Sequence, residues 1–202
     1  MNVRDLVVRP FGRIAGRFGK WPGLASFSYL ERKLLFLHIP KCGGTSIDAA
    51  IGACYPAGVR ARLDSVGAVK AAQLDGLSEG QFTQRLMPYF MAQRRLRYVS
   101  GHFQFSDTAY RTFGSEWDFV TILRHPVSRW LSAYFDNRYK SDDHTKIHED
   151  LADFVNSLRG QELAHTFMIQ LSGWRIADAL ARPNECVRAA IATLERFVLV
   201  GC

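Results

Sequence analysis

The feature that most constrains this chain is a buried strand that leads through a Gly-Gly turn into a helix. The apolar run 34–39 is typical of a strand buried on both faces. Apolar residues at helical spacing begin at Ile47. Between them lies Pro-Lys-Cys-Gly-Gly-Thr-Ser, residues 40–46. Glycines let backbone N–H groups converge on an anion, and a helix N-terminus adds unpaired N–H groups. The segment therefore predicts a phosphate-binding loop, although an ordinary glycine-containing turn is the alternative.

The position of the lysine decides between kinds of phosphate loop. A Walker A loop places its lysine after the glycines, followed by a Ser or Thr for magnesium. Here Lys41 precedes Gly43 and Gly44. The sequence also lacks a clear acidic metal-binding pair after a strand. Both features disfavour a P-loop kinase or nucleotidase, and no metal site is expected.

A second strand–turn–helix corner follows the β-branched and apolar run 119–123. Arg124 comes at its carboxyl end, where ligands collect in open α/β sheets, and Pro126 suits the first turn of a helix. Ser132 lies on that helix, off its apolar stripe. An arginine fork and a hydroxyl group can hold a phosphate dianion. A structural ion pair is the alternative role of Arg124.

The remaining pattern alternates strands and helices. Short strands are expected at 97–100 and 197–201, and a variable excursion at 55–77. Ser78 and Gln81 predict a capping box, and Asn184 is expected to cap the last helix. The apolar stripes are expected to bury the following side chains: Ile47, Ala50, Ile51 and Cys54; Phe82, Leu86, Tyr89 and Phe90; Val127, Trp130, Leu131, Tyr134 and Phe135; Leu151, Phe154, Val155 and Leu158; Val187, Ala190, Ile191 and Leu194. This order predicts an α/β fold, P-loop-like, with three α/β/α layers around a central, mainly parallel sheet.

Length and charge fit one domain with an anionic partner. The chain has 202 residues and a formal charge of +7. Residues 31–202 are expected to form the domain, and residues 1–30 a basic N-terminal arm that is either solvated or laid on a membrane surface. The chain stops directly after its last predicted strand, so the domain is expected to be truncated there. Four cysteines without metal-ligand spacing, of which Cys54 and Cys186 are expected in the core, and the lack of a signal peptide favour a cytoplasmic enzyme.

The loop at residues 40–46 resembles the 5′-phosphosulfate-binding loop of the sulfotransferases, in particular the carbohydrate branch that includes the heparan sulfate O-sulfotransferases. The resemblance implies a P-loop-like fold and the co-substrate 3′-phosphoadenosine 5′-phosphosulfate (PAPS), used without a metal. It also implies that Lys41 contacts the phosphosulfate and steadies charge on the leaving oxygen. The 5′-phosphate would be held by the rest of the loop: Cys42, Gly43, Gly44, Thr45 and Ser46.

The second corner, Arg-His-Pro-Val-Ser-Arg-Trp-Leu-Ser-Ala-Tyr at 124–134, is similar to the 3′-phosphate-binding motif of the same family. The resemblance makes Arg124 and Ser132 the two ligands of that phosphate. Arg129 matches a recurrent arginine, which either touches nucleotide or makes a structural ion pair. The resemblance covers residues 34–134 well and is loose from residue 140 onward, apart from Gln-Leu-Ser-Gly at 170–173 and the last strand.

Sulfuryl transfer needs a base that takes the proton of the attacking hydroxyl group. We favour His102, which follows the strand 97–100 in a Gly-His pair that carries the base in related carbohydrate sulfotransferases. A structural role is its alternative. The other histidines are less well placed: His38 in a buried strand, His125 in the second corner, His144 and His148 in the polar loop 140–150, and His165 in a helix.

The predicted function is therefore in-line transfer of a sulfuryl group from PAPS to a hydroxyl group of a carbohydrate or glycoconjugate, with Lys41 and His102 as catalytic residues. A lipid-linked sugar, a small metabolite and a peptide tyrosine stay open as acceptors. The excursion 55–77 and the loop 140–150 are expected to shape the acceptor pocket. The alternatives are a non-catalytic anion-binding protein and a degenerate sulfotransferase that keeps the fold. Nothing resembles a nucleic-acid-binding module.

Overall fold

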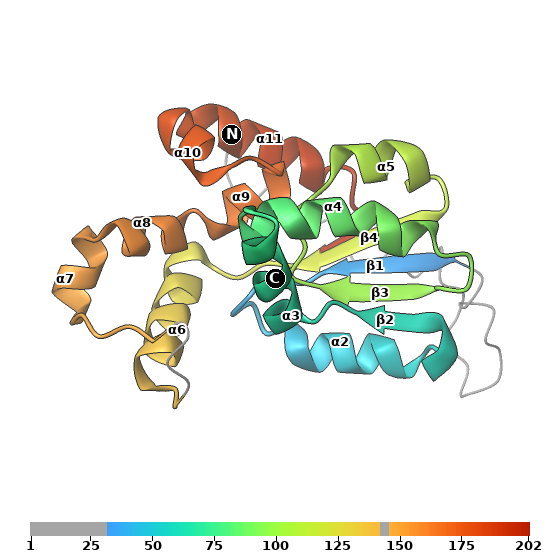
Figure 1. The fold of residues 1–202 in the computed structure, drawn as a ribbon, viewed down its shortest axis with the longest axis horizontal. Coiled ribbons are helices and arrows are strands. Elements are labelled where there is room, and N and C mark those ends of the chain that lie inside the picture. Colours follow the sequence, from blue (N-terminus) through green and yellow to red (C-terminus); the bar gives the residue numbers. More distant parts are fainter. Residues whose placement is uncertain (1–31, 142–145) are drawn as a thin grey trace.

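The centre of the molecule is a parallel sheet, shown in Figure 1. The computed structural model describes residues 32–141 and 146–202. The described strands follow the spatial order β2-β3-β1-β4-β5, and every pairing is parallel. Their bounds are β1 Lys33–Leu37, β2 Arg60–Arg62, β3 Tyr98–Gly101, β4 Trp117–Ile122 and β5 Leu199–Gly201. The predicted parallel α/β sheet is confirmed, and the N-terminal arm at 1–30 lies outside the described residues.

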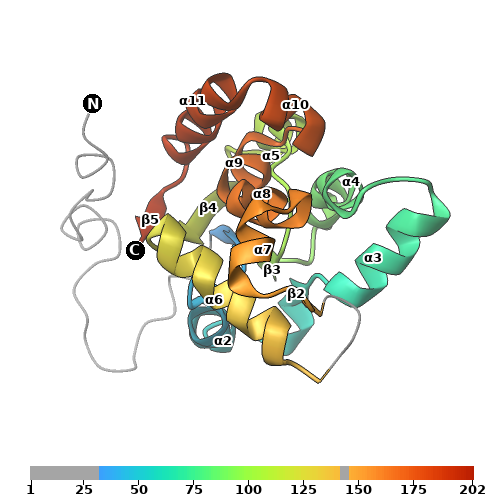
Figure 2. The same ribbon diagram turned by 90° about the vertical axis from the view of Figure 1, so that its left-hand side faces the viewer.

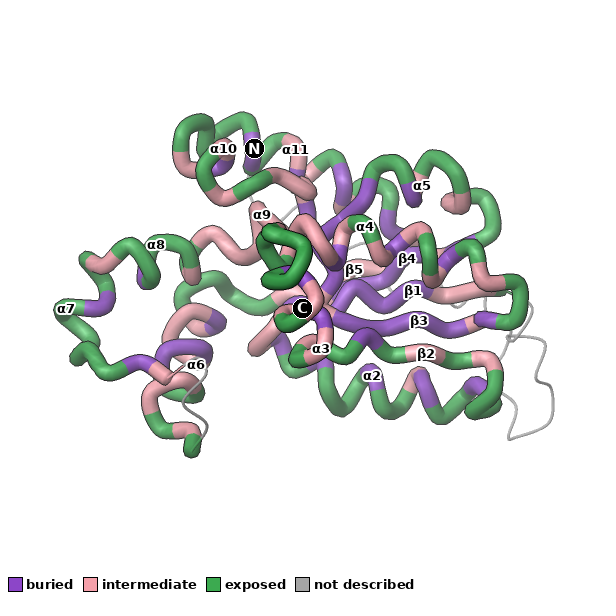
Figure 3. Tube along the Cα trace, viewed as in Figure 1, coloured by how far each residue is buried: buried purple, intermediate pink, exposed green. Residues whose placement is uncertain are grey.

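The central strand is β1, which pairs with β3 on one side and β4 on the other. Figure 3 shows the three strands β1, β3 and β4 as the most continuously buried part of the molecule. Leu35 and Leu37 are fully buried and contribute to the larger core, whereas Phe36, which points to the opposite face, belongs to a smaller cluster. Burial on both faces explains why the strand reads as a continuous apolar run.

Helices cover both faces of the sheet, which gives three layers (Figure 1). Helix α2, Gly44–Ala53, lies on one face. The opposite face carries α4 Glu79–Ala92, α5 Asp107–Phe113, α9 Thr166–Ser172 and α11 Pro183–Leu194, with α10 Ile176–Ala181 beside them and α3 Ser65–Leu74 packed against α4.

A third group of helices lies beyond the carboxyl ends of the strands. Figure 2 shows α6 Pro126–Tyr139, α7 Leu151–Asn156 and α8 Leu158–Ala164 in front of the sheet, seen from that edge. A small cluster of Tyr134, Ile147 and Phe154 holds α6 and α7 together. These helices place side chains of α6 near the loops that follow β1 and β4.

Local signals placed two of the three predicted helix starts correctly. Ser78 accepts from the backbone of Gln81, whose side chain reaches back to Ser78, so the predicted capping box is confirmed. Helix α6 begins at Pro126, as expected. The prediction for Asn184 is wrong: Arg182 is the N-cap of α11, and Asn184 lies inside the first turn after Pro183.

The predicted buried stripe of α2 is wrong. Ile47 is 37% exposed, and Ala50 and Cys54 are also exposed. The buried positions are instead Gly44, Asp48 and Gly52, spaced one turn apart. The two glycines let the helix backbone approach the sheet closely, and the carboxylate between them accepts a buried hydrogen bond. The helix therefore packs through small and polar residues, which a search for apolar spacing does not detect.

Several other expected core side chains are exposed: Tyr89, Val127, Phe135, Leu151, Val155, Leu158 and Val187. In α4 the fully buried positions are Thr83, Met87 and Met91. The segment 55–77, expected as a variable excursion, holds a 3-10 turn at Ala57–Val59, the edge strand β2 and α3. His165 separates α8 from α9 and lies in neither helix. Cys186 is buried, as predicted.

Candidate functional site

The loop between β1 and α2 lies at the carboxyl edge of the sheet. Lys41 has φ +67° and Gly43 has φ +77°, both in the left-handed region. For a residue with a side chain this conformation costs about 1 kcal/mol, so the surrounding structure holds Lys41 in a strained backbone conformation. Gly43 is the N-cap of α2 and offers no side-chain cap to the first turn. The amide N–H groups at the start of α2 are therefore suited to receive an anion.

Close packing beneath the loop requires a glycine at position 44. A Cβ atom there would lie 2.5 Å from Cδ2 of His38 and 3.2 Å from Cζ of Phe36. Thr45 and Ser46 follow on the exposed side of α2, where their hydroxyl groups are accessible.

Cys42 differs from its neighbours in the loop. Its side chain is buried among core residues, and burial raises the pKa of the thiol to about 11. A contact between Cys42 and a phosphate would therefore run through the backbone and not through sulfur.

The corner after β4 meets the phosphate loop directly. Arg124 is exposed, and its Nη1 donates to the backbone oxygen of Lys41 over 3.3 Å. The Nζ atom of Lys41 lies 2.7 Å from Oδ1 of Asp136 on α6. Ser132 precedes Asp136 by one helical turn, so both lie on the same side of α6. The structure brings the predicted residues of the two corners to one edge of the sheet.

Among the described residues Arg129 forms no ion pair, which was one of its two expected roles, and a contact with nucleotide, the other role, stays a prediction. Its side chain is 1% exposed, and Nη2 donates to the backbone oxygen of Leu163. The guanidinium lies 5.3 Å from the ring centroid of Phe167 on α9. Burial lowers the pKa of Arg129. Arg129 thus connects α6 to the junction between α8 and α9.

His102 directly follows β3. Its Nδ1 lies 2.8 Å from the backbone oxygen of His38. Because a carbonyl oxygen only accepts, Nδ1 must carry the proton, and the lone pair is left on Nε2. Burial is the main cause that lowers the pKa of His102 below its ordinary 6.5. A neutral imidazole with its basic nitrogen free is the form that a general base requires.

The other histidines do not match this arrangement. His38 follows the end of β1, and burial together with the neighbouring His102 lowers its pKa to about 4. The two imidazole rings lie 4.6 Å apart, centroid to centroid. His125 and His148 are exposed, and His144 lies outside the described residues.

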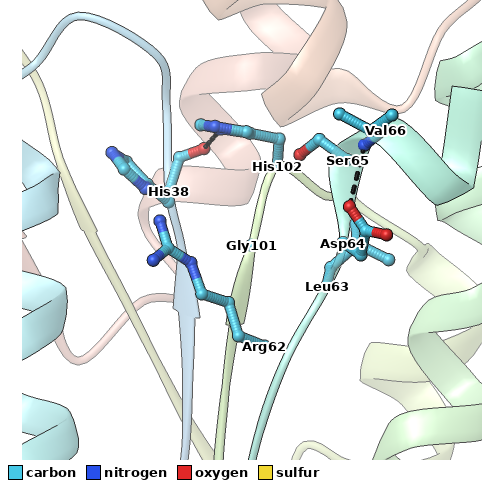
Figure 4. A pocket seen from close by; sticks show the side chains of 8 residues that line it. All are labelled: His38, Arg62, Leu63, Asp64, Ser65, Val66, Gly101 and His102. Carbon is cyan, nitrogen blue, oxygen red and sulfur yellow. Dashed lines mark hydrogen bonds between the residues drawn. The ribbon is translucent and has the colours of Figure 1, made fainter.

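Two cavities meet at His102. One, of about 400 Å³, is lined by residues from β2, the start of α3 and the two histidines, drawn in Figure 4: His38, Arg62, Leu63, Asp64, Ser65, Val66, Gly101 and His102. The other, of about 220 Å³, extends toward α4 and α9 and also contains Pro40 of the phosphate loop. The predicted base therefore borders space on two sides.

A buried network that the sequence did not suggest supports the first cavity. Asp48 on α2 is 6% exposed and accepts from the hydroxyl group of Tyr98 over 2.5 Å. Its other oxygen lies 3.3 Å from Nε of Arg62. Burial and the contact with Asp48 raise the pKa of Tyr98. Figure 4 shows the Arg62 guanidinium directed toward His38. The sequence signal for this network was a charged residue, Asp48, one helical turn after Gly44.

Neither a metal centre nor a membrane span is evident in the part of the chain that the structure describes. Over residues 32–141 and 146–202, no three His, Cys, Asp or Glu side chains are grouped in a way that would hold a metal ion. Among the same residues, no helix has both the length and the apolar character needed to cross a bilayer.

Comparisons with known proteins place this site in a family. A gluconokinase from Sinorhizobium meliloti 1021 is similar in structure, with a TM-score of 0.40 and 14% identity over 83% of this chain and 93% of that chain. No curated protein matches the sequence. The model of the sulfotransferase family matches residues 30–166, well over half of the chain, and this range includes both corners and His102. The chain therefore belongs to the sulfotransferase family.

Proposed function

We propose that this protein transfers a sulfuryl group from PAPS to a hydroxyl group of a carbohydrate or glycoconjugate, with His102 as general base. The observation that carries the proposal is the convergence of Lys41 and Arg124, whose side chain donates to the lysine backbone. PAPS carries phosphate at both the 3′ and the 5′ position of one nucleoside. Two cationic corners that meet at one sheet edge suit such a doubly phosphorylated ligand.

The residues of the loop fit the 5′ end of the donor. Gly43 has open space on the side where a Cβ would stand, and the first turn of α2 has no side-chain cap. In the proposed complex, Thr45 and Ser46 add hydroxyl donors. Arg124 and Ser132 hold the 3′-phosphate, because a guanidinium and a hydroxyl group together satisfy several of its oxygens.

The proposed reaction is an in-line displacement at sulfur. Nε2 of His102 takes the proton of the acceptor hydroxyl group, whose oxygen forms the new bond to sulfur. The bond between sulfur and the bridging oxygen of the phosphosulfate breaks, and its electron pair stays on that oxygen. The nucleotide leaves as 3′-phosphoadenosine 5′-phosphate (PAP). Lys41 stabilises the negative charge that develops on the leaving oxygen.

Lys41 must change partner for this role. Its ammonium group is paired with Asp136, and both side chains are partly exposed. Such a pair is worth about 0.2–1 kcal/mol, so a phosphosulfate can displace the carboxylate at small cost.

The experiment that tests the proposal measures PAP release from PAPS with pooled glycan acceptors, and sulfated products by mass spectrometry. His102→Ala should nearly abolish turnover and leave the affinity for PAP unchanged. Full activity of this variant would remove His102 as the base. Tight PAP binding without any turnover would instead favour a non-catalytic nucleotide-binding protein of the same fold.

A further inference from the structure

The smaller cavity beside His102 has the composition of a binding site for hydroxyl groups. It has a volume of about 220 Å³ and lies between α4 and the segment from α8 to α9. Pro40 and His102 both line it, so it joins the phosphate loop to the proposed base. A group bound here would lie next to the place where the sulfuryl group is transferred.

Gln170 on α9 is one of the lining residues and carries an unpartnered side-chain oxygen. Its Nε2 donates to the backbone oxygens of His38 and Phe103, over 3.4 and 3.3 Å. A flipped amide would set its oxygen against both carbonyl oxygens, so the orientation is fixed. The Oε1 atom is buried and has no hydrogen-bond partner among the described residues. A buried amide oxygen of this kind needs a donor.

Other groups of the lining also accept hydrogen bonds. The hydroxyl group of Thr166 donates a hydrogen bond to the backbone oxygen of Leu163 over 2.8 Å, which leaves the lone pairs of the hydroxyl oxygen available. Nε2 of His102 carries a lone pair. Glu79 and Glu162 add negative charge, and the described residues that line this cavity include no lysine or arginine. The lining is therefore rich in acceptors and acidic.

The larger cavity on the other side of His102 lacks this excess of carboxylates. Arg62 lines it, and its carboxylate, Asp64, caps α3 through a 3.0 Å bond from the backbone N–H of Val66. An anionic ligand would therefore be repelled less from that side than from the smaller cavity.

We propose that the smaller cavity holds the acceptor unit, that Oε1 of Gln170 accepts a hydrogen bond from one of its hydroxyl groups, and that Glu162 disfavours carboxylated or sulfated units. The acceptor class is then an uncharged or amine-bearing polyol, because such molecules are rich in donors. This inference rests on the proposed function. To the proposed function it adds the charge class of the acceptor and the residues that select for that class, Gln170 and Glu162.

A matched pair of glutamines tests the role of Gln170. Gln84 on α4 makes the same kind of bridge, donating to the backbone oxygens of Phe105 and Gly173 over 2.8 and 3.2 Å, but it does not line the cavity. Both Gln170→Met and Gln84→Met lose two bonds to carbonyl groups. The Gln170→Met variant alone should raise the acceptor KM, about three- to tenfold, with the affinity for PAP unchanged. Equal effects of the two substitutions on KM, or none, would overturn the proposal.

Three glycosides that differ in one group test the charge preference: methyl β-glucoside, methyl β-glucosaminide and methyl β-glucuronide. Saturation-transfer NMR on the PAP-loaded protein measures their binding without turnover. The first two should bind at least about tenfold more tightly than the glucuronide, and Glu162→Gln should narrow that difference. If Gln170→Met does not fold, the comparison of glycoside binding between Glu162→Gln and the unaltered protein tests the proposal by itself.

The outcomes separate this inference from the proposed function. Preference for the glucuronide, or no binding of any glycoside, would overturn the acceptor assignment. A preference for the glucuronide that Arg62→Gln removes would place the acceptor in the larger cavity instead. Neither result affects donor binding. Failure to bind PAP would refute the proposed function itself.

Discussion

The pH dependence of turnover tests the role of His102 most closely. The base must be neutral to take a proton, and its Nδ1–H is fixed by the carbonyl oxygen of His38. Burial lowers the pKa of His102 below 6.5. With a pKa at or below 6.5, at least about three quarters of the imidazole is neutral at pH 7. We therefore expect kcat/KM for the acceptor to rise with pH and to reach its plateau before pH 7.5, with a midpoint below 6.5.

The size of the effect is measured by removing the imidazole. General-base catalysis contributes about 10²–10⁴-fold, so His102→Ala should lower kcat/KM by that factor and flatten the acid limb. PAP release is followed between pH 5 and 8.5, with PAP affinity measured at each pH. His148→Ala removes an exposed imidazole and serves as the control. An acid limb with a midpoint above 6.5, or one that persists in His102→Ala, would refute the assignment.

Four further substitutions give distinct results. Gly44→Ala forces a Cβ to within 2.5 Å of the imidazole beneath it, so thermal denaturation should show a loss of about 2 kcal/mol. In Gly43→Ala the new Cβ meets no atom within 4 Å, so the substitution costs only the strain of φ +77°, about 1 kcal/mol. Equal losses of stability in Gly44→Ala and Gly43→Ala would contradict the packing described. Asp136→Asn releases the lysine of the phosphate loop and should tighten PAP binding about two- to fivefold by calorimetry; weaker binding would show that the carboxylate assists the site. Burial keeps His38 neutral, with a pKa of about 4. Its contribution to the free energy of unfolding is therefore complete above pH 6.5 and declines as the pH falls toward 4. Urea titrations at several pH values should show a smaller pH dependence of this free energy in His38→Asn, and an unchanged pH dependence would contradict the assignment.

The parts of the fold with local signals could be predicted from the sequence. The predicted strand segments located β1, β3, β4 and β5 to within two residues, and the Ser78 and Pro126 signals placed the starts of α4 and α6. The loop at Lys41 to Gly44 needed no tertiary information either. Its glycines are dictated by backbone conformation and by the close approach of a neighbouring side chain.

The features that could not be predicted from the sequence depend on contacts with residues far along the chain. The buried face of α2 contains Asp48 because Tyr98, fifty positions away, supplies a hydroxyl group. The buried guanidinium of Arg129 donates a hydrogen bond to the backbone oxygen of Leu163, on a later helix. Gln170 reaches the backbone oxygens of His38 and Phe103 because α9 packs beside the ends of β1 and β3. Apolar periodicity detects none of these polar contacts.

The central claim is that one doubly phosphorylated nucleoside bridges the two corners. Isothermal calorimetry of PAP and of adenosine 5′-phosphate, which lacks the 3′-phosphate, tests it directly. A charged hydrogen-bonded contact is worth about 1.5–3 kcal/mol, so PAP should bind about ten- to a hundredfold more tightly. Arg124→Ala should reduce that ratio to near one and leave the affinity for adenosine 5′-phosphate almost unchanged. Equal affinities of the two nucleotides for the unaltered protein would contradict the account.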